Sequence, residues 1–232
     1  MSPPRPRARR PRRPAYHHHD LRQALVAAGL EAVGEVGAER VSLRDLARRL
    51  GVSEAAPYHH FADKEALLAA VAGEAAQLFL DALHAAIEEA GDDQRRRFQL
   101  TGIALIKFAV AHPAHFRALG LPVMNRRLPA DVRARVEAFY QEEERRVREA
   151  QEAGFFAPIP FDDLILAATS LVHGLAHLMI DGATDVAPGD VDHAARIARA
   201  VTAVLGVGLL PRAPAGGDSG PPAPRRRSRR AR

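Results

Sequence analysis

Apolar residues recur at intervals of three and four along the chain from residue 20 to residue 208, and no segment alternates apolar and polar residues as a half-buried strand would. The pattern predicts an all-α chain of about nine helices. In the N-terminal part we expect helices at 20–36, 43–50, about 54–61 and 64–90. Beyond residue 91 we expect helices at about 94–111, 113–119, 129–153, 162–181 and 190–208.

Short polar residues and glycines set the expected ends of the helices between residues 36 and 64. Ser42 and Asp45 have the spacing of a capping box, in which a hydroxyl and a carboxylate each accept a hydrogen bond from a free amide at a helix start. Gly51 would end that helix, and Ser53 is placed to cap the next one. Asp63 is the expected cap of the long fourth helix.

The segment 42–60 carries the clearest chemical signal in the chain. Two short helices joined by Gly51-Val52-Ser53 would cross steeply, so the first braces the second and the second projects outward. A helix about 10–12 Å across fits the major groove of B-DNA, where base edges are distinguishable. The outward face would carry Glu54, Ala55, Tyr58 and His59. Pro57 would fall at the fourth helical position, where at most one hydrogen bond is lost. By spacing alone, an ordinary helical hairpin with glycine in its turn explains the segment equally well.

The stretch from Val41 to Leu68 resembles the DNA-binding domain of the TetR family of bacterial transcriptional regulators. The resemblance is carried by Gly51-Val52-Ser53, Tyr58-His59-His60-Phe61 and Asp63-Lys64-Glu65-Ala66-Leu67-Leu68, in register. It implies a three-helix helix-turn-helix DNA-binding domain over 16–65. An α-helical ligand-binding and dimerisation domain would follow over 66–208.

The resemblance also implies a function. The protein would be a ligand-responsive, sequence-specific regulator, a repressor that binds a palindromic double-stranded operator as a homodimer. It would have no enzymatic activity, no cofactor and no membrane partner, and it would lie in the bacterial cytoplasm, on the nucleoid when bound to DNA.

The family pattern assigns roles to particular residues. Ser42, Tyr58 and Lys64 would hold phosphates, Lys64 at the positive start of a helix. Arg44, Glu54, Ala55 and His59 would face bases or the adjacent backbone, and Ser53 completes the expected DNA-binding set. Phosphate contacts position such a domain and base contacts choose its site. Because so few side chains reach the DNA from one subunit, we expect a dimer that reads two half-sites.

The C-terminal part resembles a branch of the family with a Trp-His-Gly signature, although Val172 stands where the tryptophan would be. The segment 162–181 is apolar on almost every side, so it must be buried on several faces, with a partner subunit as one cover. The family pattern places 162–181 and 190–208 in a four-helix bundle between two subunits.

A ligand cavity is expected among the remaining helices. Its candidate lining residues are Phe108, His112, Phe116, Met124, Phe139, His173 and His177. Aromatic residues and methionines of this kind belong more often to a plain hydrophobic core. We expect an apolar effector, because no charged cluster lies within an apolar segment.

Charge is concentrated at the two ends of the chain. Residues 1–15 carry six arginines and no acid, residues 209–232 carry seven arginines and Asp218, and the body between them is acidic although the whole chain is +5. Arms of this composition bury little apolar surface, so we expect them to be disordered and to attract polyanions. A non-specific basic protein that binds DNA or a membrane surface is therefore one alternative function.

A metal-dependent hydrolase is the other alternative. His173 and His177 are four residues apart, a spacing that suits two metal ligands on one helical face. Gly174 stands where a zinc-protease motif has its glutamate, and no third ligand is evident. Cysteine is absent, which excludes thiolate metal sites and disulfides. We therefore predict no metal site.

Overall fold

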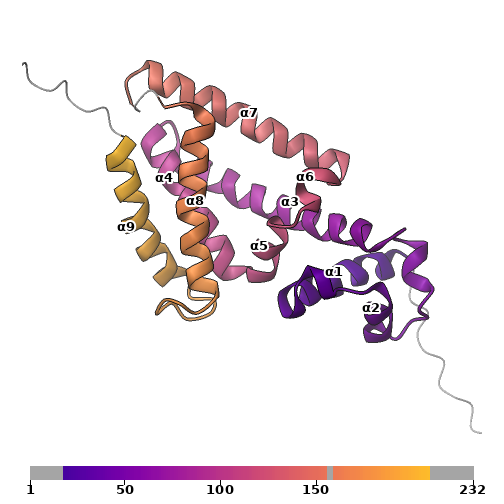
Figure 1. Ribbon diagram of the computed structural model, residues 1–232. Helices are drawn as coiled ribbons and strands as arrows, with labels where there is room; N and C mark the ends of the chain where they lie inside the picture. Colours follow the sequence, from indigo (N-terminus) through magenta and orange to yellow (C-terminus); the bar gives the residue numbers. More distant parts are fainter. Residues whose placement is uncertain (1–17, 156–158, 210–232) are drawn as a thin grey trace, which may run out of the picture.

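The computed structural model describes residues 18–155 and 159–209, and all regular structure within these ranges is helical, which confirms the predicted all-α class (Figure 1). The elements are α1 (His18–Val36), η1 (Ala38–Arg40), α2 (Leu43–Leu50), η2 (Ala56–His59), α3 (Lys64–Ala90), α4 (Gln94–Ala111), α5 (Pro113–Leu119), α6 (Val123–Arg126), α7 (Ala130–Glu152), α8 (Phe161–Ile180) and α9 (Val191–Leu209), where η denotes a 3-10 helix.

A small N-terminal unit is built from α1, α2, η2 and the first turns of α3. Leu25 of α1, Leu46 of α2 and Leu67 of α3 are fully buried at its centre, together with Phe61 from the loop before α3. These are the apolar positions whose spacing predicted the helices. Burying side chains of this size stabilises a fold by about 1.5–3 kcal/mol each, so the unit has a genuine core despite its size.

Helix α3 runs from this unit into the rest of the molecule. Asp63 begins it as predicted: its carboxylate accepts a hydrogen bond of 2.7 Å from the amide of Ala66. Gly91 ends it, 27 helical residues later, with φ of 61°. The expected domain boundary between residues 65 and 66 lies inside the first turn of α3. One continuous helix therefore connects the two parts of the chain.

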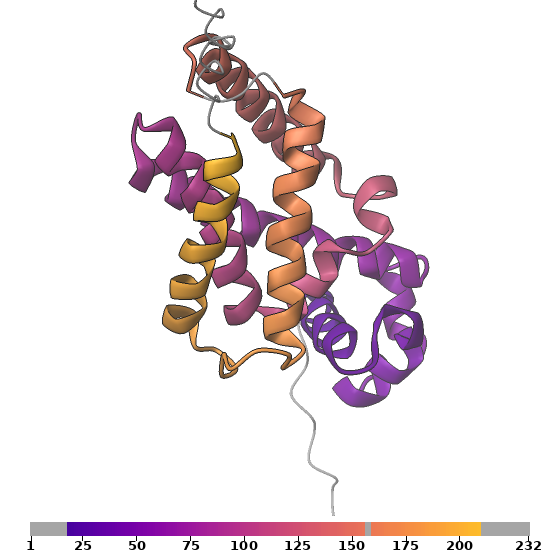
Figure 2. The ribbon, with the colours of Figure 1, turned by 60° about the vertical axis from the view of Figure 1, so that its left-hand side comes forward.

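The C-terminal part is centred on α4, which packs against α3 and α5 and also against α8 and α9. Ile106 and Ala109 of α4 are fully buried against Val172 and Ala198. Gly102 allows a close approach, because a Cβ atom there would lie 3.2 Å from Thr202 and 3.4 Å from Val172. Figure 2 shows α8 and α9 side by side, while α7 lies across the end of the bundle.

The structure corrects several local predictions between residues 42 and 61. The Ser42 side chain makes no capping hydrogen bond, although Ser42 does precede the first residue of α2. Ser53 caps no helix, and the expected α-helix over 54–61 is only the 3-10 helix η2. The short helices η1 and α6 were not predicted, because three or four residues show no apolar periodicity. The other helices agree with the predicted ranges to within two residues.

The arms fall outside this description. Of the predicted arms, 1–15 and 209–232, only Leu209, the last residue of α9, lies within the described residues. Their predicted disorder stays a prediction.

Candidate nucleic-acid interface and ligand cavity

The residues expected to contact DNA belong to the small N-terminal unit. Arg44 lies on α2, and the loop after α2 carries a second group, Ser53, Glu54 and Ala55. Tyr58 and His59 lie on η2. These six residues are exposed, whereas Ser42 and Lys64, which flank the starts of α2 and α3, are half-buried. The surface formed by the six exposed residues is accessible to a large partner molecule.

Pro57 and Tyr58 fix the direction of η2. Pro57 is fully buried in the N-terminal unit, and the next side chain, Tyr58, is 49% exposed. Proline has no amide hydrogen, so the α-helical bond back to Ser53 cannot form. The Ser53 carbonyl instead accepts from the amide of Ala56 at 3.0 Å, and the amide of Tyr58 donates to Ala55 at 3.1 Å. The tighter 3-10 turn follows from this change of partners, and it points Tyr58 away from the core.

Opposite charges lie near one another on this face. The guanidinium of Arg44 is 4.0 Å from the carboxylate of Glu54, so α2 and the loop after it are held in a loose ion pair. Both side chains are well exposed, and such pairs contribute little to stability. The Arg44 guanidinium is therefore held only weakly by Glu54.

Lys64 and Arg127 surround the start of α3. The ammonium of Lys64 donates to the carbonyl of Glu39 at 2.6 Å, which holds it beside the helix N-terminus. Arg127, from the end of α6, pairs with Asp63 at 3.2 Å and with Glu65 at 3.1 Å. The amide of Ala66 and the nearby Arg127 guanidinium lower the pKa of Asp63. This charge cluster ties the α6 segment to the start of α3.

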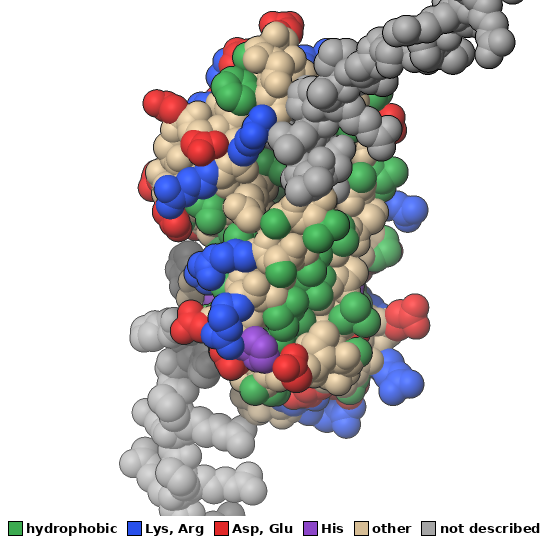
Figure 3. Space-filling view, turned by 90° about the vertical axis from the view of Figure 1, so that its left-hand side faces the viewer, with side chains coloured by type: hydrophobic (Ala, Val, Ile, Leu, Met, Phe, Trp, Pro, Cys, Tyr) green, Lys and Arg blue, Asp and Glu red, His purple; other side chains and the backbone are tan. Residues whose placement is uncertain are grey.

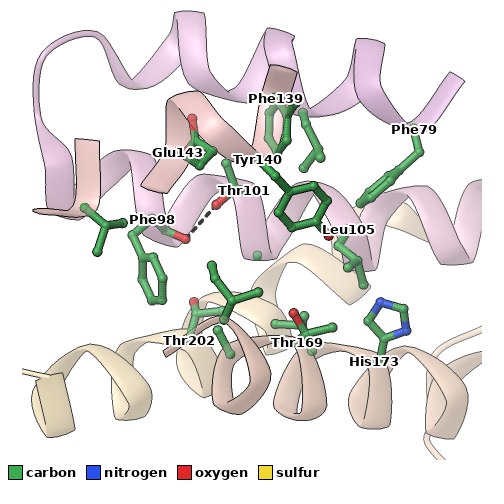
Figure 4. A pocket seen from close by; sticks show the side chains of 16 residues that line it. Phe79, Phe98, Thr101, Leu105, Phe139, Tyr140, Glu143, Thr169, His173 and Thr202 are labelled. Atoms are coloured by element: carbon green, nitrogen blue, oxygen red, sulfur yellow. Dashed lines mark hydrogen bonds between the residues drawn. The ribbon is translucent and has the colours of Figure 1, made fainter. Parts of the chain in front are cut away.

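A cavity of about 150 Å³ lies among α3, α4, α7, α8 and α9 (Figure 4). Most of its wall is apolar, and four aromatic side chains contribute to it. The labelled lining residues are Phe79, Phe98, Thr101, Leu105, Phe139, Tyr140, Glu143, Thr169, His173 and Thr202. Figure 4 shows Tyr140 reaching from α7 toward the helix that carries Thr169 and His173. An apolar pocket with a few polar groups is typical of small-molecule sites.

The charged group in the wall is neutralised by a partner. Glu143 accepts from Arg97 of α4 at 2.5 Å, and both side chains are largely buried, at 18% and 8% exposure. This pair was not predicted, because the two residues are 46 positions apart and no local pattern joins them. Tyr140 was not predicted either, although an aromatic pair at 139–140 in a highly charged helix is a usable signal.

The predicted pocket residues do not gather in one place. Phe139 and His173 line the cavity, whereas Phe108 and His112 line a groove beside α3 and α4. Phe116 and His177 border a shallow depression near α5, which His173 also reaches. Met124 is half-buried against the N-terminal core and borders none of these hollows. The predicted set therefore divides over four locations.

Helix α5 connects the cavity wall with the N-terminal unit. The ring of Phe116 lies 5.1 Å from that of His173 and 5.2 Å from that of His177. Burial, with some repulsion from His177, lowers the pKa of His173. On the other side, α5 packs so tightly on α1 that a Cβ atom at Gly34 would lie 3.1 Å from Ala114. A change at His173 can thus reach α1 through two contacts.

Helices α8 and α9 present an apolar outer face. Leu166, Gly174 and Leu178 recur at intervals of four and eight along α8, and all are exposed. Val204 of α9 is 74% exposed. Figure 3 shows hydrophobic side chains gathered on this side of the molecule. Contiguous apolar surface of this kind marks an interaction site.

Among the residues that the structure describes, two helices are long and apolar enough to cross a bilayer, by length and composition alone. They are α3, whose apolar stretch is 56% buried, and α8, whose apolar stretch is only 22% buried. Burial in the fold accounts for α3. Burial within the described fold does not account for the apolar composition of α8.

The residues in the described ranges form no cluster of three side chains that could hold a metal ion. His177 approaches Asp181 at 3.8 Å, but Asp181 is bound at 2.8 Å by Arg117. A metal cation at the Asp181 carboxylate would compete with the guanidinium of Arg117, which already binds it. The geometry gives no support to the hydrolase alternative at His173 and His177.

Comparison with known proteins gives matches over both parts of the chain. The family model described as bacterial regulatory proteins, tetR family, matches residues 25–71, and the model of the tetracyclin repressor-like C-terminal domain matches residues 98–205. Tetracycline repressor protein class C from Escherichia coli is 40% identical over 77 residues, which is 33% of this chain and 33% of that protein. The chain thus matches about a third of the length of this curated relative.

Solved structures match over greater lengths. A protein of unknown function from Rhodococcus sp. RHA1 is 34% identical, with a TM-score of 0.66, over 86% of this chain and all of that one. A TetR family transcription regulator from Marinobacter aquaeolei VT8 shares the fold, with a TM-score of 0.60 and 22% identity over 78% of this chain and 94% of that one. Since the two family models together match more than half of the chain, the protein belongs to the TetR family of bacterial regulatory proteins.

Proposed function

We propose that the protein is a ligand-responsive, sequence-specific DNA-binding regulator that acts as a homodimeric repressor on a palindromic operator. The observation that carries this proposal is the opposed orientation of Pro57 and Tyr58: one anchors η2 in the core and the other stands free on the surface. Because Pro57 anchors η2 in the core and Tyr58 is exposed, η2 is suited to insertion into a DNA groove. The regulator acts without catalysis, in the bacterial cytoplasm and on the nucleoid when bound.

The DNA contacts follow from the exposed face. Tyr58, Ser42 and Lys64 hold phosphates, and the position of the last two at the starts of α2 and α3 supports these roles, because helix N-termini attract anions. Arg44, Glu54 and His59 face base edges or adjacent backbone. Ser53 and Ala55 allow the loop to approach closely because they are small. Phosphate contacts set the register, and base contacts select the sequence.

A second copy of the chain covers α8 and α9. The exposed leucines of α8 and Val204 of α9 support this arrangement, since an uncovered apolar face favours association. A two-fold dimer is the common form of such assemblies. It places two copies of Tyr58 about one helical turn of DNA apart, roughly 34 Å.

A ligand can change DNA binding only if a structural element with two arrangements contacts both the cavity and the DNA-binding unit. The contacts from His173 to Phe116, and from α5 to α1, supply a physical connection. A ligand that fits the cavity better in one arrangement of α5 shifts the population toward that arrangement. The operator affinity then changes by the same coupling free energy.

Selection of fragments bound by the full chain from random DNA tests the proposal. We expect an inverted repeat, and we expect Tyr58→Ala to weaken binding to the recovered sequence at least tenfold while leaving the thermal unfolding midpoint within about 2 °C, because the side chain packs little. Excess random DNA should not displace the operator. An unstructured pool of recovered fragments would remove the specific-regulator function and favour a non-specific basic protein.

A further inference from the structure

The polar groups of the cavity divide into two sets. Three are already satisfied: Glu143 is bound to Arg97, Thr101 donates to the carbonyl of Phe98, and Thr202 donates to that of Ala198. The hydroxyls of Tyr140 and Thr169 and the imidazole of His173 have no hydrogen-bond partner within the described part of the chain. Tyr140 is 50% exposed, and Thr169 and His173 are half-buried. These three groups are therefore accessible and can form hydrogen bonds to a ligand.

The cavity offers no uncompensated charge. The carboxylate of Glu143 is matched by the guanidinium of Arg97, in a pair that is largely buried. Burial lowers the pKa of His173, so its imidazole is neutral at pH 7. A charged ligand would lose its hydration here and gain no opposite charge, which is costly in an apolar site. The wall therefore selects against carboxylates and ammonium groups.

The volume and the aromatic lining of the cavity favour a ligand that contains an aromatic ring. Phe79, Phe98, Phe139 and Tyr140 all face the cavity, and their rings can stack on or meet the edge of an aromatic ligand. A cavity of about 150 Å³ lined by apolar side chains is large enough for benzene, and the volume here is the same. The free hydroxyls lie on two facing walls, Tyr140 on α7 and Thr169 on α8 (Figure 4).

We propose that the effector of this regulator is an uncharged aromatic compound with a single ring bearing a carbonyl oxygen, which accepts hydrogen bonds from Tyr140 and Thr169, with His173 as a third donor. This inference rests on the proposed function, because it names the ligand class of the regulatory cavity. The carbonyl suits the site because all three free groups can donate. The ring occupies the aromatic part of the wall.

A set of compounds on one skeleton tests the class. Full-length protein without DNA is titrated with acetophenone, ethylbenzene, benzoate and 1-phenylethylamine, and affinities are measured by protein-observed NMR at millimolar concentrations. We expect acetophenone to bind about fivefold more tightly than ethylbenzene, which lacks the carbonyl. It should bind at least tenfold more tightly than the anion or the cation. Equal or tighter binding of benzoate or of the amine, or no binding of any compound, would overturn the inference.

Substitutions that remove only the hydroxyl identify the donors. Tyr140→Phe and Thr169→Val should each lower the affinity for acetophenone about three- to fivefold and leave that for ethylbenzene unchanged. Thr184→Val, the same change in the loop between α8 and α9 and outside the cavity lining, should alter neither affinity. A uniform loss for both compounds, or no change for either, would contradict the assigned donors.

These outcomes are separable from the fate of the proposed function. The titrations need no DNA, and the selection from random fragments needs no ligand. A recovered inverted repeat together with tight binding of benzoate would keep the regulator and remove the ligand class. An unstructured DNA pool together with selective binding of acetophenone would keep the chemistry of the cavity and remove its regulatory role.

Discussion

The ring of Phe116 lies 5.1 Å from that of His173, so a residue of α5 touches the side chain that closes one part of the cavity. Phe116→Leu keeps an apolar side chain of similar volume but removes the ring contact. We expect both DNA affinity and acetophenone affinity to stay within about threefold of the wild type, while the effect of acetophenone on DNA affinity is lost. Fluorescence anisotropy of a labelled operator, with and without the compound, measures this coupling.

The matched control for that change is Phe155→Leu, since Phe155 is exposed and lies just beyond the end of α7. It should leave the coupling intact. If Phe116→Leu also responds normally to acetophenone, the contact between α5 and α8 carries no signal.

The buried pair Arg97–Glu143 is expected to dominate the electrostatic contribution to stability. Glu143→Gln leaves the guanidinium buried without an opposite charge, which costs about 3–5 kcal/mol when a buried pair is broken. Asp81→Asn breaks the exposed pair with Arg135 and should cost less than about 1 kcal/mol. Urea unfolding of both variants measures the difference, and equal losses would contradict the assigned environments.

Acid should destabilise the joint between α3 and α5 through His115. Its imidazole lies 3.9 Å from Glu74, but burial and the neighbouring His112 lower its pKa below the ordinary value of 6.5. The unfolded chain therefore binds this proton at a higher pH than the folded one does. This contribution to stability is complete above pH 6.5 and is lost as the pH falls toward the lowered folded pKa.

NMR titration of the His115 ring checks the sign. Glu74→Gln removes an opposing carboxylate, so the pKa of His115 should fall further. His115→Gln should flatten the dependence of the unfolding free energy on pH between about 7 and 5. A rise in the pKa of His115 in the Glu74→Gln variant would contradict the stabilising role of Glu74, and a wild-type pKa at or above 6.5 would show that burial and His112 do not dominate.

The apolar face of α8 should control the oligomeric state. Leu178→Glu places a charge among exposed apolar residues that a second copy would bury, so we expect monomers in sedimentation velocity at micromolar concentration. Val36→Glu makes the same change at an exposed position of α1 and should leave the dimer intact. A dimer that survives Leu178→Glu would place the subunit contact elsewhere.

Helix periodicity predicted most of the fold, because positions such as Leu25, Leu46 and Leu67 must share one face to form a core. The predicted bounds of α3 agree with the structure because Asp63 and Gly91 act locally, through a capping carboxylate and a positive φ. The prediction for 54–61 was wrong because one missing amide at Pro57 changes the whole turn. The hydroxyls of Ser42 and Ser53 can bond to several neighbouring groups, and a sequence pattern does not show which of these bonds forms.

The residues expected to face DNA could be grouped from the sequence more readily than the residues that line the cavity. Residues around Tyr58 are contiguous, so a motif places them together. The cavity draws on five helices, and its distinguishing groups, such as Tyr140 and Glu143, come together only through long-range packing. Met124 was expected in the pocket on residue type alone, and the packing of α6 places it against the N-terminal core.

Because α3 is one continuous helix, a tilt at its cavity end moves its other end. Lys64 stands at one end, and Leu83 borders the cavity about 19 residues along, a span of roughly 28 Å. A tilt of about 5° at the cavity end carries the tip near the duplex through roughly 2.5 Å, by the rise per residue of an α-helix. In the proposed dimer both ends would shift, which would disturb the match to two groove faces a helical turn apart. A small ligand in the cavity could thus move the start of α3, roughly 28 Å away along the helix.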